Sequence, residues 1–283
     1  MLSYPASAIS TSDGQVNVLQ ITDLHLSSPV SAAVNARSEK THSEAEVCQY
    51  CFENILKQAL NSNQRCDLIL VTGDLVNEVQ PAIYDHIFAV LQATGIPFAC
   101  IAGNHDVTDE RNSELPFFQR ELIARDTDAR LLNRHVIETD HWQLLLLDSS
   151  LTGKVEGEVT PSDIDWLCKR LSDCMKPALI ALHHHVIPVD SNWIDGHMVQ
   201  NADIFWQKMA AYKHLKVIIS GHTHQEQVRH CQGVTVYTTP STCYQFAPFE
   251  DDFAYDKSAP PGYRWLQLAN NGEVASWVER LDT

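Results

Sequence analysis

Short clusters of histidine, aspartate and asparagine recur along this chain, each closely following an apolar run. They read Asp23-Leu24-His25, Gly73-Asp74, Gly103-Asn104-His105-Asp106, His183-His184-His185 and Gly221-His222-Thr223-His224. Any one cluster could be an ordinary turn, because Gly, Asn and Asp tolerate left-handed backbone conformations. Imidazole nitrogens with carboxylate or amide oxygens are also a donor set that transition metals bind in proteins. The repetition of one pattern therefore indicates metal chemistry.

Seven side chains from these clusters make up the candidate ligand set. They are Asp23, His25, Asp74, Asn104, His184, His222 and His224. Mixed nitrogen and oxygen donors without thiolate suit manganese, iron, zinc or cobalt, and argue against calcium or a closed structural zinc site. The set is too large for one tetrahedral ion and fits two octahedral ions that share a carboxylate and a water. It predicts a binuclear centre.

The clusters can meet only if the strands before them end at a common edge. Apolar and β-branched runs predict strands over 16–22, 67–72, 98–102, 142–147, 178–182, 216–220, 234–239 and 263–268. If the strands are parallel, every cluster lies at the carboxyl edge, where open α/β sheets bind ligands.

Helices are expected between these strands. Ser43 and Glu46 form a capping-box pattern at the start of one helix. Pro81 suits the first turn of a second helix, and Gly95 suits its end. Further helices are expected over 114–124, 160–175 and 201–213. The alternation predicts an α/β (α+β) fold, with parallel or mixed sheet covered by helices.

The ends of the chain and its charge bound the remaining possibilities. Residues 1–14 predict a loose tail, and residues 225–283 are expected to complete a single domain over 1–283. A formal charge of −16 disfavours broad attraction to nucleic acid or anionic membrane. No run approaches the roughly 20 apolar residues of a transmembrane helix, and the N-terminus lacks a secretory pattern. We expect a soluble, cytoplasmic protein.

The cysteines are expected to be free thiols. The chain has eight of them, scattered and without a secretory signal, which favours a reducing compartment. The close pair Cys48 and Cys51 falls on an apolar helical stripe, where cysteine packs as a small hydrophobe.

The order of the clusters resembles that of the calcineurin-like metallophosphoesterases. Residues 16–224 carry Asp-x-His, Gly-Asp, Gly-Asn-His-Asp, His-His and Gly-His-x-His in that family's order. The resemblance implies a metallophosphoesterase fold, a central β-sandwich of mixed sheets flanked by helices, with a two-metal site. By position, the first metal would be held by Asp23, His25 and His224, the bridge would be Asp74, and the second metal would be held by Asn104, His184 and His222.

The resemblance leaves the histidine triplet open by one residue. His184 is preferred to His183 and His185, because the family's ligand usually lies two residues before a proline-bearing position, which here is Val186. The implied cofactors are two di- or trivalent metal ions, iron and manganese before zinc or cobalt.

A closer resemblance is to the bacterial class III cyclic AMP phosphodiesterases. It rests on residues 183–188, 191–195, 240–246 and 259–264. It implies hydrolysis of 3′,5′-cyclic AMP or another cyclic nucleotide, a small-molecule partner, to the 5′-monophosphate. Trp193, Tyr244 and Phe246 could stack on the nucleobase or pack their loop down, and both interpretations stay open.

The expected chemistry follows from charge. Two divalent ions, offset by Asp23, Asp74 and one bridging hydroxide, leave about one positive charge to receive a phosphodiester anion. A metal lowers the pKa of bound water to about 7, so the hydroxide can attack phosphorus. His105 adjoins the ligand Asn104 and is our candidate proton donor to the departing alkoxide, although a structural role is an alternative. The role of Asp106 stays open.

Other functions remain possible from the sequence. Another metallophosphoesterase could act on phosphomonoesters, nucleotide pyrophosphates or glycerophosphodiesters. A non-enzymatic scaffold on the same fold would be expected to lose ligands, and none is lost here. Barrel amidohydrolases also use His-x-His, but place it early in the chain with an aspartate late, which is the reverse of this order.

Overall fold

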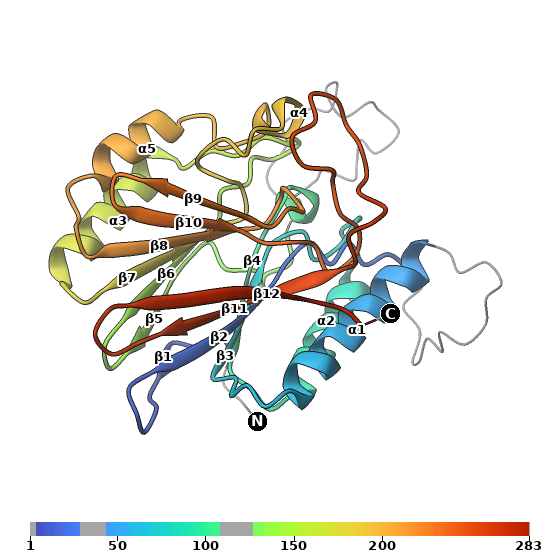
Figure 1. Ribbon diagram of the computed structural model, residues 1–283, viewed down its shortest axis with the longest axis horizontal. Helices are drawn as coiled ribbons and strands as arrows, with labels where there is room; N and C mark the ends of the chain where they lie inside the picture. Colours follow the sequence, from blue (N-terminus) through green and yellow to red (C-terminus); the bar gives the residue numbers. More distant parts are fainter. Residues whose placement is uncertain (1–3, 29–43, 108–126, 283) are drawn as a thin grey trace.

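The computed structural model describes residues 4–28, 44–107 and 127–282, in which two mixed β-sheets pack face to face with helices outside them (Figure 1). The seven-stranded sheet contains, in spatial order, β1 (Ala8–Ile9), β5 (Arg134–Thr139), β6 (Gln143–Leu147), β7 (Ala178–Ala181), β8 (Leu215–Ser220), β10 (Val234–Thr238) and β9 (Gln227–Cys231). The five-stranded sheet contains β12 (Val274–Arg280), β11 (Gly262–Leu268), β2 (Val16–Ile21), β3 (Leu68–Thr72) and β4 (Phe98–Ile101). The predicted sandwich of mixed sheets flanked by helices is confirmed.

The strands that precede the clusters are parallel within each sheet. β2 pairs with β3 and β3 with β4, while β7 lies between β6 and β8. Both faces of these strands are covered, so their sequences are mostly apolar rather than alternating, although β2 also buries Asn17 and Gln20. This explains why they were readable from the sequence.

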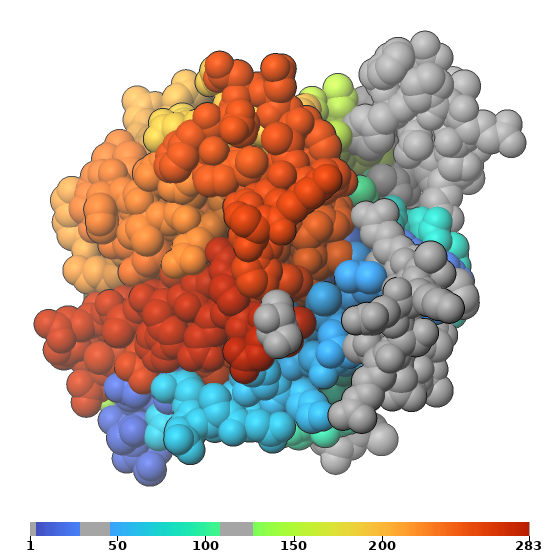
Figure 2. Space-filling model, turned by 45° about the vertical axis from the view of Figure 1, so that its right-hand side comes forward, coloured from blue at the N-terminus to red at the C-terminus, as the bar shows by residue number. Residues whose placement is uncertain are grey.

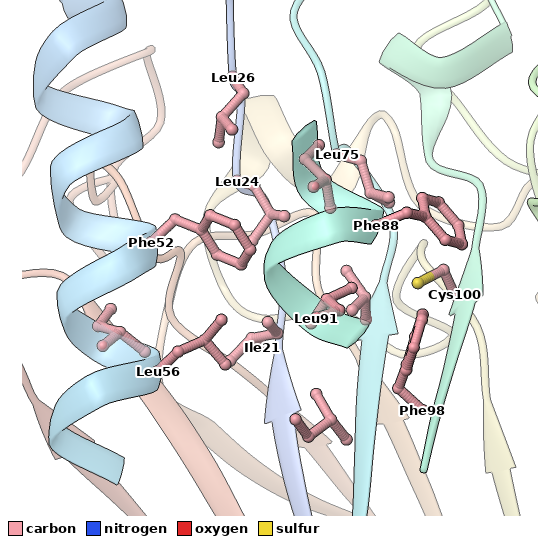
Figure 3. Close-up of a cluster of buried hydrophobic side chains, with 14 of the residues drawn as sticks. Ile21, Leu24, Leu26, Phe52, Leu56, Leu75, Phe88, Leu91, Phe98 and Cys100 are labelled. Atoms are coloured by element: carbon pink, nitrogen blue, oxygen red, sulfur yellow. The ribbon is translucent and has the colours of Figure 1, made fainter. Parts of the chain in front are cut away.

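Helices α1 (Glu44–Asn61) and α2 (Pro81–Ala93) cover the five-stranded sheet. Figure 3 shows Phe52 and Leu56 of α1 and Leu91 of α2 directed at the strands beneath them. Ile21 of β2 is one of the strand residues in this cluster. Pro81 is the first residue of α2, as predicted.

Helices α3 (Pro161–Asp173) and α5 (Ala202–Met209) cover the seven-stranded sheet. The side chain of Thr160 caps α3 by accepting a hydrogen bond from the backbone N–H of Asp163. A third apolar cluster fills the space between the sheets, with Val18 and Leu70 from one and Leu144 and Val217 from the other. Side chains from both sheets thus share this cluster, while the single domain over residues 1–283 stays a prediction.

The structure corrects the expectation of a loose N-terminal tail. Ala8 and Ile9 pair in parallel with β5, and Ile9 is buried between the sheets. The ring of Tyr4 packs on Phe88 and Phe98. Apolar contacts at a few positions therefore order a segment whose composition is mostly small and polar. The predicted capping box at Ser43 and the predicted helix over 114–124 lie outside the described residues.

The expectation of free thiols fails at two positions. Cys48 of α1 and Cys243, in the segment after β10, form a disulfide with their Cα atoms 4.8 Å apart. The other six cysteines are free. Figure 2 shows the surface of α1 (blue) meeting the red surface of the C-terminal strands, where Gln58 also donates to the backbone carbonyl of Arg280.

Candidate metal centre

The predicted ligands occupy sharp turns at the carboxyl ends of β2, β3, β4, β7 and β8. In the described chain, eight non-glycine residues have positive φ, and five of these are predicted ligands. They are Asp23 (53°), His25 (48°), Asp74 (50°), His222 (65°) and His224 (49°). Asp and His adopt this left-handed region more readily than most residues, yet it still costs energy and is concentrated at functional sites. The conformation is thus a second mark of a site, independent of residue type.

Two glycines let these turns approach one another. A Cβ atom on Gly103 would lie 2.3 Å from the carboxylate of Asp74, and one on Gly221 would lie 2.5 Å from that of Asp23. Neither has the positive φ that a permissive turn glycine would show. The absence of a side chain is needed here for close packing of two loops rather than for backbone freedom.

Asp23, His25 and His224 form one ligand group. A side-chain nitrogen or oxygen from each lies within 4.8 Å of the others. Nε2 of His224 is 3.1 Å from Oδ1 of Asp23 and 3.2 Å from Nε2 of His25. These three residues, brought from β2 and β8, are the set that the sequence assigned to the first metal.

Asp74 lies between this group and a second one. Its Oδ2 is 3.8 Å from Nε2 of His25, whereas its Oδ1 is 3.4 Å from Nε2 of His183. The same His183 nitrogen is 3.2 Å from Oδ1 of Asn104. Asp74 is therefore placed as a bridging carboxylate would be, with Asn104 on the far side.

The preference for His184 over His183 stays a prediction, because a ring nitrogen of each lies within 4.8 Å of the other and of one from His222. The hydrogen bonds of the two rings nevertheless differ. Nδ1 of His184 is 2.8 Å from the hydroxyl of Ser149 and its Nε2 is 3.0 Å from the carbonyl of Val155, so both ring nitrogens are engaged. Nδ1 of His183 is held 2.8 Å from the carbonyl of Thr72, which leaves Nε2 directed at Asp74 and Asn104. The geometry favours His183.

The register stays open by one residue because the proline used as a landmark is absent. Val186 stands there and gave no reliable reference point. Room for the His184 ring comes from Gly157, where a Cβ atom would lie 2.4 Å from that ring. Nε2 of His185 is 3.1 Å from Oδ1 of Asp195, which gives the third histidine a partner away from Asp74.

His222 provides a test of whether this group suits a metal. Its Nε2 is buried and has no hydrogen-bond partner among the described residues. Its ring lies 5.1 Å from that of His183, centroid to centroid. A buried polar nitrogen is costly unless it binds something. Together with the nitrogen and oxygen donors around it, this orphan atom fits a metal ligand.

The charge of the site also suits a metal. Burial opposes ionisation of Asp74, but the imidazoles of His183 and His105 outweigh it and hold its pKa well below the usual range. Burial, with His184 and His183 nearby, holds the pKa of His222 far below its ordinary value. The ionised carboxylate of Asp74 and the neutral imidazole of His222 are the protonation states that metal binding requires. Burial lowers the pKa of His183, but the charge of Asp74 outweighs it and raises that pKa to about 9, so this ring would release a proton on binding a metal.

His105 lies at the rim of the two groups. It is half-buried, and its backbone N–H donates to Oδ1 of Asp74 at 2.9 Å. Its ring stands edge-on to that of His25 with centroids 4.9 Å apart, and its Nδ1 is 3.4 Å from the carbonyl of Asn77. It is thus close enough to Asp74 to act at the same centre, from a more accessible position than the ligands.

Asp106, whose role the sequence left open, supports the loops. It is fully buried, and its Oδ2 accepts hydrogen bonds from the backbone N–H groups of Gly103 (2.9 Å) and Leu75 (3.1 Å). Its Oδ1 accepts from the hydroxyl of Tyr84 at 2.7 Å. It therefore ties the turn after β3 to the turn after β4, which carry Asp74 and Asn104.

Aromatic side chains surround the first ligand group. The ring of Phe246 stacks on His224 with centroids 4.2 Å apart, and the ring of Tyr244 stacks on His25 at 5.1 Å. Trp193 meets Phe246 edge-on at 4.9 Å. Tyr244 and Phe246 thus do pack down on ligands, which was one of the two open interpretations.

Two further aromatics were missed by sequence reasoning. Phe253 is 54% exposed and Tyr255 is 48% exposed, and both rings contact Phe246. They lie in the same proline- and aromatic-rich stretch, which was the only signal available. We call residues 244–255 the aromatic segment; it rises beside α4 (Asn192–Asp195) in Figure 1, where Asn192 donates to Asp251. A cavity of about 260 Å³ borders Phe246 and His224.

The ligand geometry agrees with comparison to known families. The family model for calcineurin-like phosphoesterases matches residues 16–226, which is most of the chain. The chain belongs to this family. Membership implies an enzyme of phosphoester hydrolysis with a binuclear metal site, and the Asp and His groups described above are placed to form it.

Comparison with individual proteins shows which members of the family the chain is similar to. The chain is 71% identical, over the full length of both proteins, to a probable cyclic nucleotide phosphodiesterase from Psychrobacter arcticus. It is 32% identical to the 3′,5′-cyclic adenosine monophosphate phosphodiesterase CpdA from Escherichia coli, over 95% of this chain and 91% of that protein. A solved dimetal phosphatase from Danio rerio shares the fold, with a TM-score of 0.57 and 14% identity over 94% of this chain and 99% of that one. No helix in the described part of the chain combines the length and apolarity needed to cross a bilayer.

Proposed function

We propose that this protein is a metal-dependent phosphodiesterase that hydrolyses 3′,5′-cyclic AMP, with other cyclic nucleotides as further substrates, to the 5′-monophosphate. The observation that carries the proposal is the pair of ligand groups joined through Asp74, with His105 at their rim. The names of the Psychrobacter and Escherichia relatives support the substrate class.

Two metal ions would be held by the residues of the two groups. The first ion would be held by Asp23, His25 and His224, the bridge would be Asp74, and the second ion would be held by Asn104, His183 and His222. Mixed imidazole and oxygen donors favour iron and manganese, and are compatible with zinc or cobalt. When bound, such ions lower the pKa of water and neutralise charge on the phosphate.

The protein's own residues supply position and a proton. Hydrolysis forms a bond from a water oxygen to phosphorus and breaks the bond from phosphorus to the 3′ oxygen, which must gain a proton. We assign that proton to the ring of His105, which lies beside Asp74 and is half-buried. The carbonyl of Asn77, 3.4 Å from Nδ1, favours the tautomer or charge state with a proton on that nitrogen. In the doubly protonated ring Nε2 carries the second proton, and this is the proton that would be transferred to the 3′ oxygen, leaving the neutral tautomer with its proton on Nδ1.

The aromatic side chains would bind the nucleobase. Trp193, Tyr244 and Phe246 are assigned to this role, with Phe253 added from the structure. Tyr244 and Phe246 lie against His25 and His224, so a base stacked on this cluster would lie next to the ligand groups. Stacking accepts any base, which is consistent with activity on more than one cyclic nucleotide.

A substrate panel tests the proposal. Catalytic efficiency would be compared on 3′,5′-cyclic AMP, 3′,5′-cyclic GMP, 2′,3′-cyclic nucleotides, a generic aryl phosphodiester and a phosphomonoester, with manganese or iron present. We expect the highest efficiency on 3′,5′-cyclic AMP. An efficiency that is more than about tenfold higher on the generic diester would contradict the assignment, since stacking of the base should favour the nucleotide by at least that factor. Preference for the phosphomonoester would identify a different metallophosphoesterase activity.

A further inference from the structure

The disulfide joins a packed helix to the segment that holds the first ligand group. Cys48 lies in α1, which Phe52, Ile55 and Leu56 fix onto the five-stranded sheet. Cys243 lies in the short stretch 241–246, directly before Tyr244. Both cysteines are buried, so the bond crosses the interior between these two parts of the chain.

Residues 241–246 contact every member of the first ligand group. The hydroxyl of Ser241 donates to the backbone carbonyl of Asp23 at 2.7 Å. The carbonyl of Tyr244 lies 2.8 Å from Nδ1 of His224, and the ring of Tyr244 stacks on His25. Each ligand therefore depends on this stretch for its orientation, through a hydrogen bond or a ring contact.

Cys243 is tied into these contacts by short steps. Its backbone N–H donates to the hydroxyl of Ser241 at 2.8 Å, which is the same hydroxyl that contacts Asp23. The next residue back, Thr242, donates its N–H to the carbonyl of Thr22 at 3.1 Å. A change in the position of Cys243 would therefore reach Asp23 through a single intervening side chain, that of Ser241.

The second ligand group has supports of its own. His183 is held by the carbonyl of Thr72 at 2.8 Å, and the loop that carries Asn104 is held by Asp106. These supports come from β3 and from the turn after β4 rather than from the stretch after β10. His222, the third member, is instead tied to the first group, because its backbone N–H donates to the carboxylate of Asp23 at 3.1 Å. The second group is thus held apart from residues 241–246 at His183 and Asn104, and is linked to them only indirectly at His222.

We propose that the Cys48–Cys243 disulfide is a redox-controlled anchor of the first metal site. The inference rests on the proposed binuclear centre and concerns its regulation. A dithiol reductant supplies two electrons and two protons, the sulfur–sulfur bond breaks, two thiols form, and the reductant becomes a disulfide. Residues 241–246 are then no longer linked to α1, and the first site binds its metal more weakly. Oxidation by a small-molecule disulfide reverses the change.

Metal binding measured without substrate tests the anchor. Manganese affinity would be determined by equilibrium dialysis on oxidised protein and on protein reduced with a dithiol that is removed before metal is added. The His183→Ala background isolates the first site, and the His224→Ala background isolates the second. We expect reduction to weaken binding at the first site on the order of tenfold, as is usual when a support of a ligand is lost, and to weaken the second site less, since His183 and Asn104 keep their own supports.

Matched variants separate the disulfide from a general loss of folding. Cys48→Ala/Cys243→Ala should bind manganese as the reduced protein does in either redox state. Cys51→Ala removes a buried cysteine from the same helix and should behave as the wild type. Binding at the second site is an internal measure of folding, because a general loss of folding would weaken both sites equally.

The outcomes that would overturn the anchor are distinct from failure of the proposed function. Equal manganese affinity of the first site in oxidised and reduced protein would refute it. So would a titration of eight thiols per unfolded chain after oxidation, where the disulfide leaves six. If the substrate panel instead favours another phosphoester, the proposed substrate fails while the anchor still stands.

Discussion

The carboxyl edge of the sheets, which carries the predicted ligands and is called the ligand edge below, lies against the aromatic segment. The two regions are built in different ways. The ligands are almost fully buried, follow regular strands directly and are tied in by glycines and by Asp106. The aromatic segment contains no long strand or helix and exposes about half of Phe253 and Tyr255. A buried, over-determined edge suits chemistry that needs fixed distances. A half-exposed aromatic surface suits recognition of a planar group that enters and leaves. The difference suggests that the edge sets the reaction and the segment sets the substrate.

The largest effect is expected at Asp74, which lies between the two ligand groups. Asp74→Asn keeps the shape but removes the charge that a bridging ligand supplies. We expect kcat to fall by roughly a thousandfold or more for every phosphodiester, because the metals contribute several kcal/mol to the transition state. Steady-state kinetics on cyclic AMP and on an aryl diester would measure it. Loss on only one of these substrates would contradict the assignment of the reaction to the ligand edge and of substrate choice to the aromatic segment.

His105→Ala tests the proton donor. General acid catalysis is typically worth about a hundredfold to ten-thousandfold, so kcat should fall within that range while metal content is unchanged. The effect should shrink on an aryl diester, whose phenolate leaves without a proton. Full activity of the variant on cyclic AMP would remove this role from His105 but leave the metal site intact.

The histidine triplet gives a sharper contrast. His183→Ala should remove a ligand and lower metal affinity at the second site by at least about a hundredfold. His184→Ala should cost about tenfold, because its ring nitrogens contact Ser149 and Val155 instead. The two variants differ by one position and provide mutual controls in equilibrium dialysis. A larger loss of metal affinity in His184→Ala than in His183→Ala would identify His184 as the ligand, as the sequence favoured.

Phe253→Ala tests the aromatic segment without touching a ligand. Loss of one stacking ring is worth about 1–3 kcal/mol, so kcat/KM for cyclic AMP should fall about tenfold or more, mainly through KM. The value for a small aryl phosphate diester should change little. Equal losses on both substrates would show that the segment supports the edge instead of selecting the substrate.

The smallest effect is expected at Tyr84, a residue behind the edge. Tyr84→Phe deletes the hydroxyl that donates to Asp106 and should lower the free energy of unfolding by about 1–2 kcal/mol. Urea unfolding, with an unchanged slope, would measure the loss. Cyclic AMP hydrolysis should be retained, because Asp106 keeps its bonds to Leu75 and Gly103.

The sequence predicted the parts of the fold that are buried on both sides. β2, β3, β6, β7 and β8 are mostly apolar and buried, whereas β5, β9 and β12 are partly exposed, carry more polar residues and were missed. β9 and β12 lie at sheet edges, and most of their residues are only partly buried or exposed. Each pairs antiparallel with the strand next to it in the chain, β5 with β6, β9 with β10 and β12 with β11, so the sequence lacked a clear apolar pattern rather than a nearby partner.

The predicted ligands come together in the structure because each follows a strand at the same sheet edge. The sequence could not decide between His183 and His184, since both follow β7 and only the contacts of their rings distinguish them. The disulfide was also invisible, because Cys48 and Cys243 are 195 residues apart and only the fold brings them together. Local order is thus readable from the sequence, while long-range partners are not.

The central claim is a binuclear centre bridged by Asp74. Metal content per chain, measured by elemental analysis after reconstitution with excess manganese and desalting, tests it most directly. We expect about two ions per chain in the wild type and fewer in Asp74→Asn, as two-metal sites require a shared ligand. One ion or none per wild-type chain would contradict the account.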